Sequence, residues 1–306
     1  MKRSSKLLLF TLVASLMLLA VGCSSIETDT AEQGLYIIEA NQVGELLKGD
    51  GVVLVDTQNP EDYAKEHIKD AVNISRSDVV MNIPVPNMLA PKGKIEEVLG
   101  KKGISNDTII VIYDQNNNMD SARLWWTLMV YGHEKIKVVS GGLNALKATG
   151  LETSTEVPTV KEAKYTAKDK NTEMIATLDD VKMQVNEPKE NIVLLDTRSQ
   201  EEFNEGTIPG SILSDYSENN YSDGTYKSPQ HIQIQYIEKG ITPDKTIIMY
   251  CKTSIRGAQT YLALYDAGYR NLKLYDGAWV QYSANKTLPV QTPTGNKVEP
   301  SQQDMS

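Results

Sequence analysis

One cysteine at the end of an apolar run is the residue most suited to chemistry. The run 246–250 leads into a loop with the residues Cys251, Lys252, Thr253, Ser254, Ile255, Arg256 and Gly257, and a helical stretch follows from about residue 257. In parallel α/β folds, ligands bind beyond the carboxyl ends of strands, where the next helix points its amino terminus. The loop N–H groups, the helix dipole and the cations Lys252 and Arg256 favour a nucleophilic thiolate. The alternative is a buried, inert thiol.

The elements that must position this loop occur twice in the chain. The apolar runs 51–57 and 191–197 both end in Asp-Thr, and the runs 108–113 and 246–250 follow them at similar offsets. Short apolar runs of this kind suit strands that are buried on both faces. A helical stretch that ends near Gly132 or Gly268 comes next, followed by another short apolar run. Strands that alternate with helices predict an α/β fold with a mainly parallel sheet in each half.

The cysteine loop resembles the active-site loop of the rhodanese sulfurtransferase family, which reads roughly Cys-x-Ser/Thr-Gly-x-Arg. Cys251, Thr253 and Arg256 match this pattern, whereas Ser254 stands where the family usually has glycine. The resemblance extends from about residue 34 to about residue 288 and implies two tandem rhodanese-like domains, each a mainly parallel β-sheet flanked by helices. It also includes an Asp-x-Arg element after the first strand of the second half, with Asp196 in a structural role and Arg198 near the substrate.

The first half lacks the cysteine, because Asp114 stands in its place and Gln58 replaces the arginine of the Asp-x-Arg element. A carboxylate cannot carry sulfane sulfur, and the segment 122–126 resembles the inactive half of tandem relatives. We expect Trp125 and Trp126 in this segment to be core or domain-interface residues. The predicted organisation is a lipoprotein signal peptide at 1–22, a tether at 23–33, an inactive domain at 34–151, a linker at 152–172, a catalytic domain at 173–290 and a disordered tail at 291–306.

The resemblance implies sulfur transfer through a Cys251 persulfide, from thiosulfate or a similar small anionic donor to a thiol or cyanide acceptor. The expected substrate-binding residues are Arg198, Lys252, Thr253 and Arg256, and the expected structural residues of the active loop are Asp196, Ser254, Ile255 and Gly257. Phosphatases of this fold place five residues between Cys and Arg, whereas this chain has four, so phosphate chemistry is disfavoured. The alternatives are a 3-mercaptopyruvate sulfurtransferase and a non-enzymatic, lipid-anchored module that binds persulfide or senses redox state.

The amino terminus indicates export and attachment to a membrane. Lys2, Arg3 and Lys6 precede the apolar stretch 7–21, which is short for a membrane span and typical of a secretory signal. The segment before Cys23 resembles a bacterial lipobox, in which the cysteine is acylated and becomes the first residue. We therefore expect a membrane-anchored lipoprotein outside the cytoplasm, because two acyl chains hold a protein stably at a bilayer.

Composition limits the other partners. The net charge is −9, from 31 Lys and Arg against 40 Asp and Glu, and this sign repels nucleic acid. Cys23 and Cys251 are the only two cysteines, too few for a disulfide framework. The three histidines His67, His133 and His231 are far apart without ligand spacing, so we expect neither a metal nor another cofactor.

Overall fold

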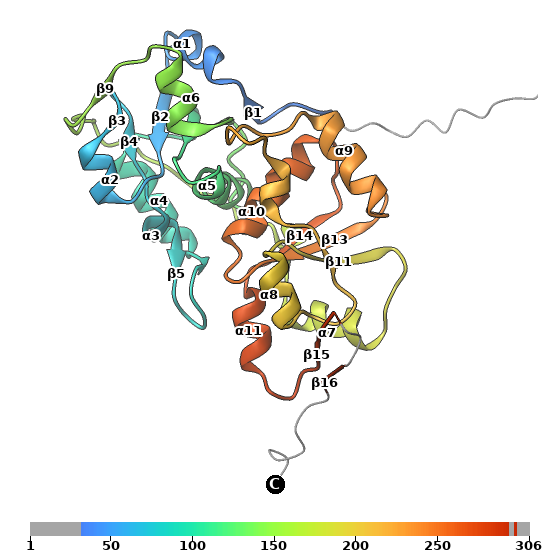
Figure 1. Ribbon diagram of the computed structural model, residues 1–306. Helices are drawn as coiled ribbons and strands as arrows, with labels where there is room; N and C mark the ends of the chain where they lie inside the picture. The colour runs from blue at the N-terminus through green and yellow to red at the C-terminus, as the bar shows by residue number, and fades with distance from the viewer. Residues whose placement is uncertain (1–31, 294–296, 299–306) are drawn as a thin grey trace, which may run out of the picture. The chain divides into compact units, whose positions relative to one another are not determined.

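Two five-stranded parallel sheets form the frame of the protein (Figure 1). The structure is a computed structural model that describes residues 32–293 and 297–298; Cys23 with its signal segment, and most of the predicted tail, lie outside the described residues. The first sheet has the order β1 (Ile37–Ile38), β8 (Ile136–Val139), β7 (Ile109–Tyr113), β2 (Val52–Asp56) and β4 (Val72–Asn73). The second repeats it with β10 (Ile175–Ala176), β14 (Leu272–Tyr275), β13 (Thr246–Tyr250), β11 (Ile192–Asp196) and β12 (Ile212–Leu213). The predicted fold class is thereby confirmed.

Helices flank both sheets. Those of the first half are α1 (Val43–Leu46), α2 (Pro60–Lys65), α3 (Arg76–Val79), α4 (Lys92–Lys101), α5 (Met119–Val130) and α6 (Gly142–Ala148). Those of the second half are α7 (Leu178–Asn186), α8 (Gln200–Glu205), α9 (Pro229–Glu238), α10 (Ile255–Asp266) and α11 (Ala278–Ala284). Short 3-10 helices lie at η1 (Ala40–Gln42), η2 (Thr172–Met174) and η3 (Tyr216–Asn219).

Three small antiparallel pairs complete the secondary structure. They are β3 (His67–Ile68) with β9 (Thr153–Ser154), β5 (Val80–Met81) with β6 (Met88–Leu89), and β15 (Val290–Gln291) with β16 (Lys297–Val298). The first pair ties the start of the segment predicted as a linker back to the first half. The second pair forms a hairpin that approaches the second half, as described below.

Polar caps in the sequence explain where the helices that follow the first strand of each half begin. Asn59 accepts a hydrogen bond from the backbone N–H of Asp62 at the start of α2, and Ser199 accepts one from Glu202 at the start of α8. Such caps satisfy N–H groups that lack partners inside the helix. Because each cap comes soon after its strand, both helices start near the carboxyl ends of the strands, which is where the cysteine loop lies.

Helices α5 and α10 pack against each other where the two halves meet, as Figure 1 shows. Trp125 of α5 lies with its ring centroid 6.0 Å from that of Tyr261 and 5.5 Å from that of Tyr265, both of α10. Trp125 and Trp126 are fully buried, in agreement with their predicted packing role. One continuous apolar cluster includes residues of both halves. Each of these helices directly follows a loop at a strand end, so the two loops belong to a shared structural unit.

Candidate functional site

Cys251 stands immediately after β13, at the carboxyl end of the second sheet. The neighbouring strand β11 runs parallel, and its last residue, Asp196, is paired with Tyr250. The Cys251 side chain is buried with 1% of the residue exposed. The backbone carbonyl of Cys251 accepts a hydrogen bond from the N–H of Trp279 at 2.9 Å, and the Lys252 carbonyl accepts one from Val280. Helix α11 therefore holds the start of the loop in place.

Ser254 shapes the turn from the loop into α10. Its backbone has φ +65° and ψ −5°, the left-handed conformation that favours glycine, which is the residue usual in the family. The serine hydroxyl lies 2.7 Å from the Thr253 carbonyl oxygen and 3.1 Å from Asp276 Oδ1, and it accepts a hydrogen bond from Arg123 Nη1 at 2.9 Å. These contacts hold the left-handed turn, and α10 begins at Ile255, two residues before the predicted start.

Arg256 lies in the first turn of α10 and is held by Glu202 from α8. Its terminal nitrogens donate to the two carboxylate oxygens at 2.5 and 2.8 Å. Burial lowers the pKa of Arg256, but its interactions with Glu202 and Cys251, the hydrogen bond to Glu202 first, outweigh burial, so that the pKa is raised. Arg256 is thus a permanent cation beside the thiol.

The Arg198 side chain is directed into the protein interior. Its Nε lies 2.9 Å from Asp196 Oδ1 and its Nη2 lies 2.6 Å from Oδ2, while Nη2 also donates to the Gly206 carbonyl at 2.7 Å. The guanidinium carbon sits 4.4 Å from the ring centroid of Trp279. Only 2% of Arg198 is exposed. These contacts brace the end of β11 against α11, and a direct role for Arg198 in binding substrate stays a prediction.

The other predicted loop residues differ in exposure. Lys252 is exposed, whereas Ile255 is buried. Thr253 accepts a hydrogen bond on Oγ1 from Asn87 Nδ2 at 3.0 Å, and Asn87 belongs to the first half. At Gly257, an added Cβ would lie 2.8 Å from a side-chain carbon of Leu274, so glycine permits close packing of α10 on the sheet. The structure brings these residues together in one loop, and their catalytic or binding roles stay predictions.

The corresponding loop of the first half shows what its backbone can bind. Asp114 follows β7, and its Oδ1 accepts hydrogen bonds from the N–H groups of Asn116 at 2.9 Å and Asn118 at 3.0 Å. Its Oδ2 accepts from the N–H groups of Asp120 at 2.9 Å and Ser121 at 3.1 Å. Burial raises the pKa of Asp114, as does the Asp120 carboxylate, while these N–H groups lower it. Loop and helix N–H groups thus surround a carboxylate where the second half has its cysteine.

The two loops share the geometry that produces this arrangement. Asn118 precedes α5 with φ +62° and ψ 13°, close to the angles of Ser254 before α10. The first N–H groups of a helix lack partners inside it and favour negative charge. The residue before α10 thus has the same backbone conformation as the residue before α5.

Several important residues were not identified as site residues from the sequence. Asn87 and Arg123 belong to the first half, and no local pattern indicates that they reach the loop of the second half. Asp276 lies outside the cysteine loop in sequence, yet its carboxylate accepts from Arg123 Nη1 at 2.8 Å and from the Leu89 N–H at 2.7 Å. Glu202 follows Arg198 closely in sequence, and this spacing is the local signal that it belongs to the site. Among the described residues, no group of His, Cys, Asp and Glu could hold a metal ion.

His67 lies outside the cysteine loop. His67 is buried, with Nδ1 2.7 Å from the Tyr63 carbonyl oxygen and its ring stacked on that tyrosine, so it has a structural environment.

Within the part of the chain that the structure describes, no helix is long and apolar enough to cross a membrane. The predicted lipidation of Cys23 and the location outside the cytoplasm stay predictions.

Comparison with protein families matches residues 39–149 and 177–285 to the Rhodanese-like domain. A Saccharopolyspora erythraea protein named "Putative thiosulfate sulfurtransferase" is 28% identical, over 88% of this chain and 96% of the relative. A Haloferax volcanii protein of the same name is 30% identical, over 78% of this chain and 86% of the relative.

Solved structures show the same fold. SseA from Escherichia coli, described as a 3-mercaptopyruvate sulfotransferase with the rhodanese fold, has a TM-score of 0.72 and 25% identity, over 80% of this chain and 98% of that one. An anaerobic ergothioneine biosynthesis enzyme from Chlorobium limicola has a TM-score of 0.75 and 21% identity, over 86% of this chain and 71% of that one. The latter likeness concerns the fold alone.

Proposed function

Since the chain belongs to the rhodanese family, with two tandem Rhodanese-like domains, we propose that it is a sulfurtransferase that takes sulfane sulfur from thiosulfate through a persulfide on Cys251. The observation that carries the proposal is the position of Cys251 directly after β13 and before α10. The corresponding loop of the first half binds a carboxylate through four N–H groups. A persulfide anion on Cys251 has the same need for N–H donors.

The reaction proceeds in two covalent steps. The Cys251 thiolate attacks the terminal sulfur of thiosulfate, a sulfur–sulfur bond forms to the protein, and the sulfur–sulfur bond of thiosulfate breaks to release sulfite with its electron pair. The persulfide anion then gives its outer sulfur to cyanide or a thiolate, which yields thiocyanate or a new persulfide and restores the Cys251 thiolate. Arg256 supports the negative charge of the donor, and Lys252 adds an exposed cation at the loop.

Thiocyanate formation from thiosulfate and cyanide tests this proposal. The protein is compared with Cys251→Ser and with Cys23→Ser, the matched control that removes the other cysteine. We expect Cys251→Ser to abolish turnover and Cys23→Ser to retain it, and mass spectrometry to find one added sulfur atom on Cys251 after thiosulfate alone. Turnover that survives in Cys251→Ser would refute the role of this thiol. A stable persulfide without turnover would instead support the non-enzymatic module.

A second candidate substrate is 3-mercaptopyruvate, because of the likeness to Escherichia coli SseA. Arg256, although it is paired with Glu202, and the exposed Lys252 place positive charge at the loop, which favours the dianionic thiosulfate over this monocarboxylate. The rate of pyruvate release from 3-mercaptopyruvate, compared with that of sulfite release from thiosulfate at equal concentrations, decides between them. If pyruvate release were faster than sulfite release, 3-mercaptopyruvate would be the preferred donor in place of thiosulfate.

We further propose that the protein is a lipoprotein held at a membrane outside the cytoplasm through acylated Cys23. The support is the signal-like segment 1–22 and the residues that precede Cys23. Incorporation of a labelled fatty acid into the full chain, but not into Cys23→Ser, is the expected result. An unlabelled protein that fractionates with the cytoplasm would overturn this assignment.

A further inference from the structure

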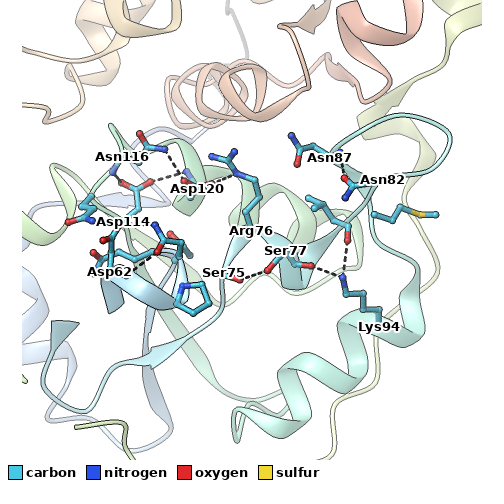
Figure 2. Close-up of a pocket in the computed structure, with 17 residues that line it drawn as sticks. Asp62, Ser75, Arg76, Ser77, Asn82, Asn87, Lys94, Asp114, Asn116 and Asp120 are labelled. Carbon is cyan, nitrogen blue, oxygen red and sulfur yellow. Dashed lines mark hydrogen bonds and ion pairs between the residues drawn. The ribbon is translucent and has the colours of Figure 1, made fainter. Parts of the chain in front are cut away.

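The first half carries a pocket of about 840 Å³ around the loop that lacks the cysteine (Figure 2). This volume lies within the range of roughly 300–1,000 Å³ that is usual for small-molecule sites. Most of the lining residues are of polar types, and six of the side chains are carboxamides: Gln58, Asn59, Asn82, Asn87, Gln115 and Asn116. Such a lining suits a hydrophilic compound.

Arg76 supplies the pocket with an available guanidinium edge. The residue comes from α3, and its Nε donates to Asp120 Oδ1 at 2.6 Å. Within residues 32–293, its two terminal nitrogens have no protein partner. Figure 2 shows the guanidinium near Asp120 and directed away from Ser77 and Lys94. Because the two terminal nitrogens are fixed in one plane, they match the two oxygens of a carboxylate.

The pocket wall carries charges of both signs, with Arg76 and Lys94 against Asp62, Asp114 and Asp120, and this mixed charge disfavours a polyanion. The loop N–H groups that would bind an anion already hold Asp114. Asp120 stands on α5 where the second half has Arg256 on α10, so the charge of the site is inverted between the halves. The hydrogen bond from Lys65 also holds the pKa of Asp62 below its ordinary value, which keeps this carboxylate ionised at the rim. A ligand with a positive group as well as one carboxylate fits these charges.

We propose that this pocket binds a short zwitterionic peptide of two or three residues. The terminal carboxylate pairs with the free nitrogens of Arg76. Because Asp120 already pairs with Arg76, the terminal ammonium faces Asp62 at the rim. Gln58, Asn59, Asn87 and Asn116 already donate within the protein, so the amide groups of Asn82 and Gln115 are the ones left to donate to the peptide. This site lies in the half without the reactive cysteine, so peptide binding does not depend on sulfur transfer.

Calorimetric titration of the full chain with triglycine tests the site. We expect saturable binding that falls about tenfold or more in Arg76→Met, since a charged hydrogen bond is lost. Arg76→Lys keeps the charge but lacks the planar edge, and it should bind with intermediate affinity. Triglycine amide and N-acetyl-triglycine, which each lose one terminal charge, should bind more weakly than triglycine. The matched control is Lys182→Met, an exposed cation of the second half that should bind triglycine normally.

Three results would overturn the proposal: absence of saturable binding, equal binding of triglycine by Arg76→Met, or equal binding of sodium acetate and triglycine. The last result would mean that any carboxylate is accepted. Cys251→Ser should bind triglycine as the unchanged protein does. A failure of thiosulfate turnover would therefore leave this experiment interpretable.

Discussion

Arg123→Met should destabilise the protein strongly, although the change lies in the half without the cysteine. Arg123 is fully buried, and its Nη1 donates to Asp276 Oδ1 at 2.8 Å and to Ser254 Oγ at 2.9 Å. Its Nη2 donates to the Asn87 carbonyl at 2.9 Å. Methionine retains an apolar stem against Trp126 but leaves the buried Asp276 carboxylate without its cation.

Loss of one partner of a buried ion pair costs about 3–5 kcal/mol, because the other charge remains desolvated. Urea unfolding should therefore show a fall in the midpoint of roughly 1–5 M, for slopes of about 1–3 kcal/mol per molar urea. The matched control is Lys101→Met, which removes an exposed pair with Glu97 and should leave the urea midpoint nearly unchanged.

The double variant Arg123→Met with Asp276→Asn separates the ion pair from general packing. Its cost should fall short of the sum of the single costs by more than about 1 kcal/mol, because the uncompensated charge is gone. A cost for Arg123→Met as small as that of the Lys101 control would refute the reasoning. Under our proposal, the rate of sulfur transfer without urea should also be lower in Arg123→Met, because Ser254 loses the contact that helps to hold its left-handed turn.

Three further outcomes are expected. Gly142→Ala places a Cβ 2.0 Å from a backbone oxygen at φ +55° and should cost several kcal/mol in urea unfolding, whereas Gly93→Ala, in open space within α4, should stabilise by up to about 1 kcal/mol. Burial lowers the pKa of His133, so the unfolded chain binds the proton more readily; stability should fall as pH drops below about 6.5, and a slope that persists unchanged in His133→Gln would contradict this. Arg256→Met should reduce kcat/KM for thiosulfate about tenfold or more, because a charged contact near the sulfur is lost, and the exposed Lys252→Met should have a smaller effect in the same assay.

The repeat of apolar runs predicts the parallel sheets well, because buried strands and strand-ending Asp-Thr pairs are local features. Strand β13 has the bounds of its apolar run 246–250, and β7 lies within its run 108–113. The start of α10 is harder to predict from the sequence. It depends on the left-handed turn at Ser254, which is held by side chains from other parts of the chain. A serine at that position gives no local sign of its conformation.

The candidate site likewise has one part that the sequence predicts and one part that it does not. Its loop is contiguous in sequence, so the grouping of Cys251 with Arg256 follows directly from the motif. Contacts from Asn87 and Arg123 depend on how the first half packs on the second, and a single sequence does not encode that packing in a readable pattern. The sequence identifies both Arg198 and Asp196, but it does not predict that their side chains point toward each other and form an ion pair.

The position of Arg123 has an evolutionary consequence. The helix that carries it follows the loop in which Asp114 stands at the position of Cys251, yet its guanidinium supports the loop of the other copy. After such a duplication, mutation can erase the chemistry of one copy while selection still acts on its interior. Deleting that copy would uncover Tyr261 and leave Asp276 without a countercharge. The first half therefore acts as a folding partner of the second half, because it supplies contacts that the cysteine loop depends on.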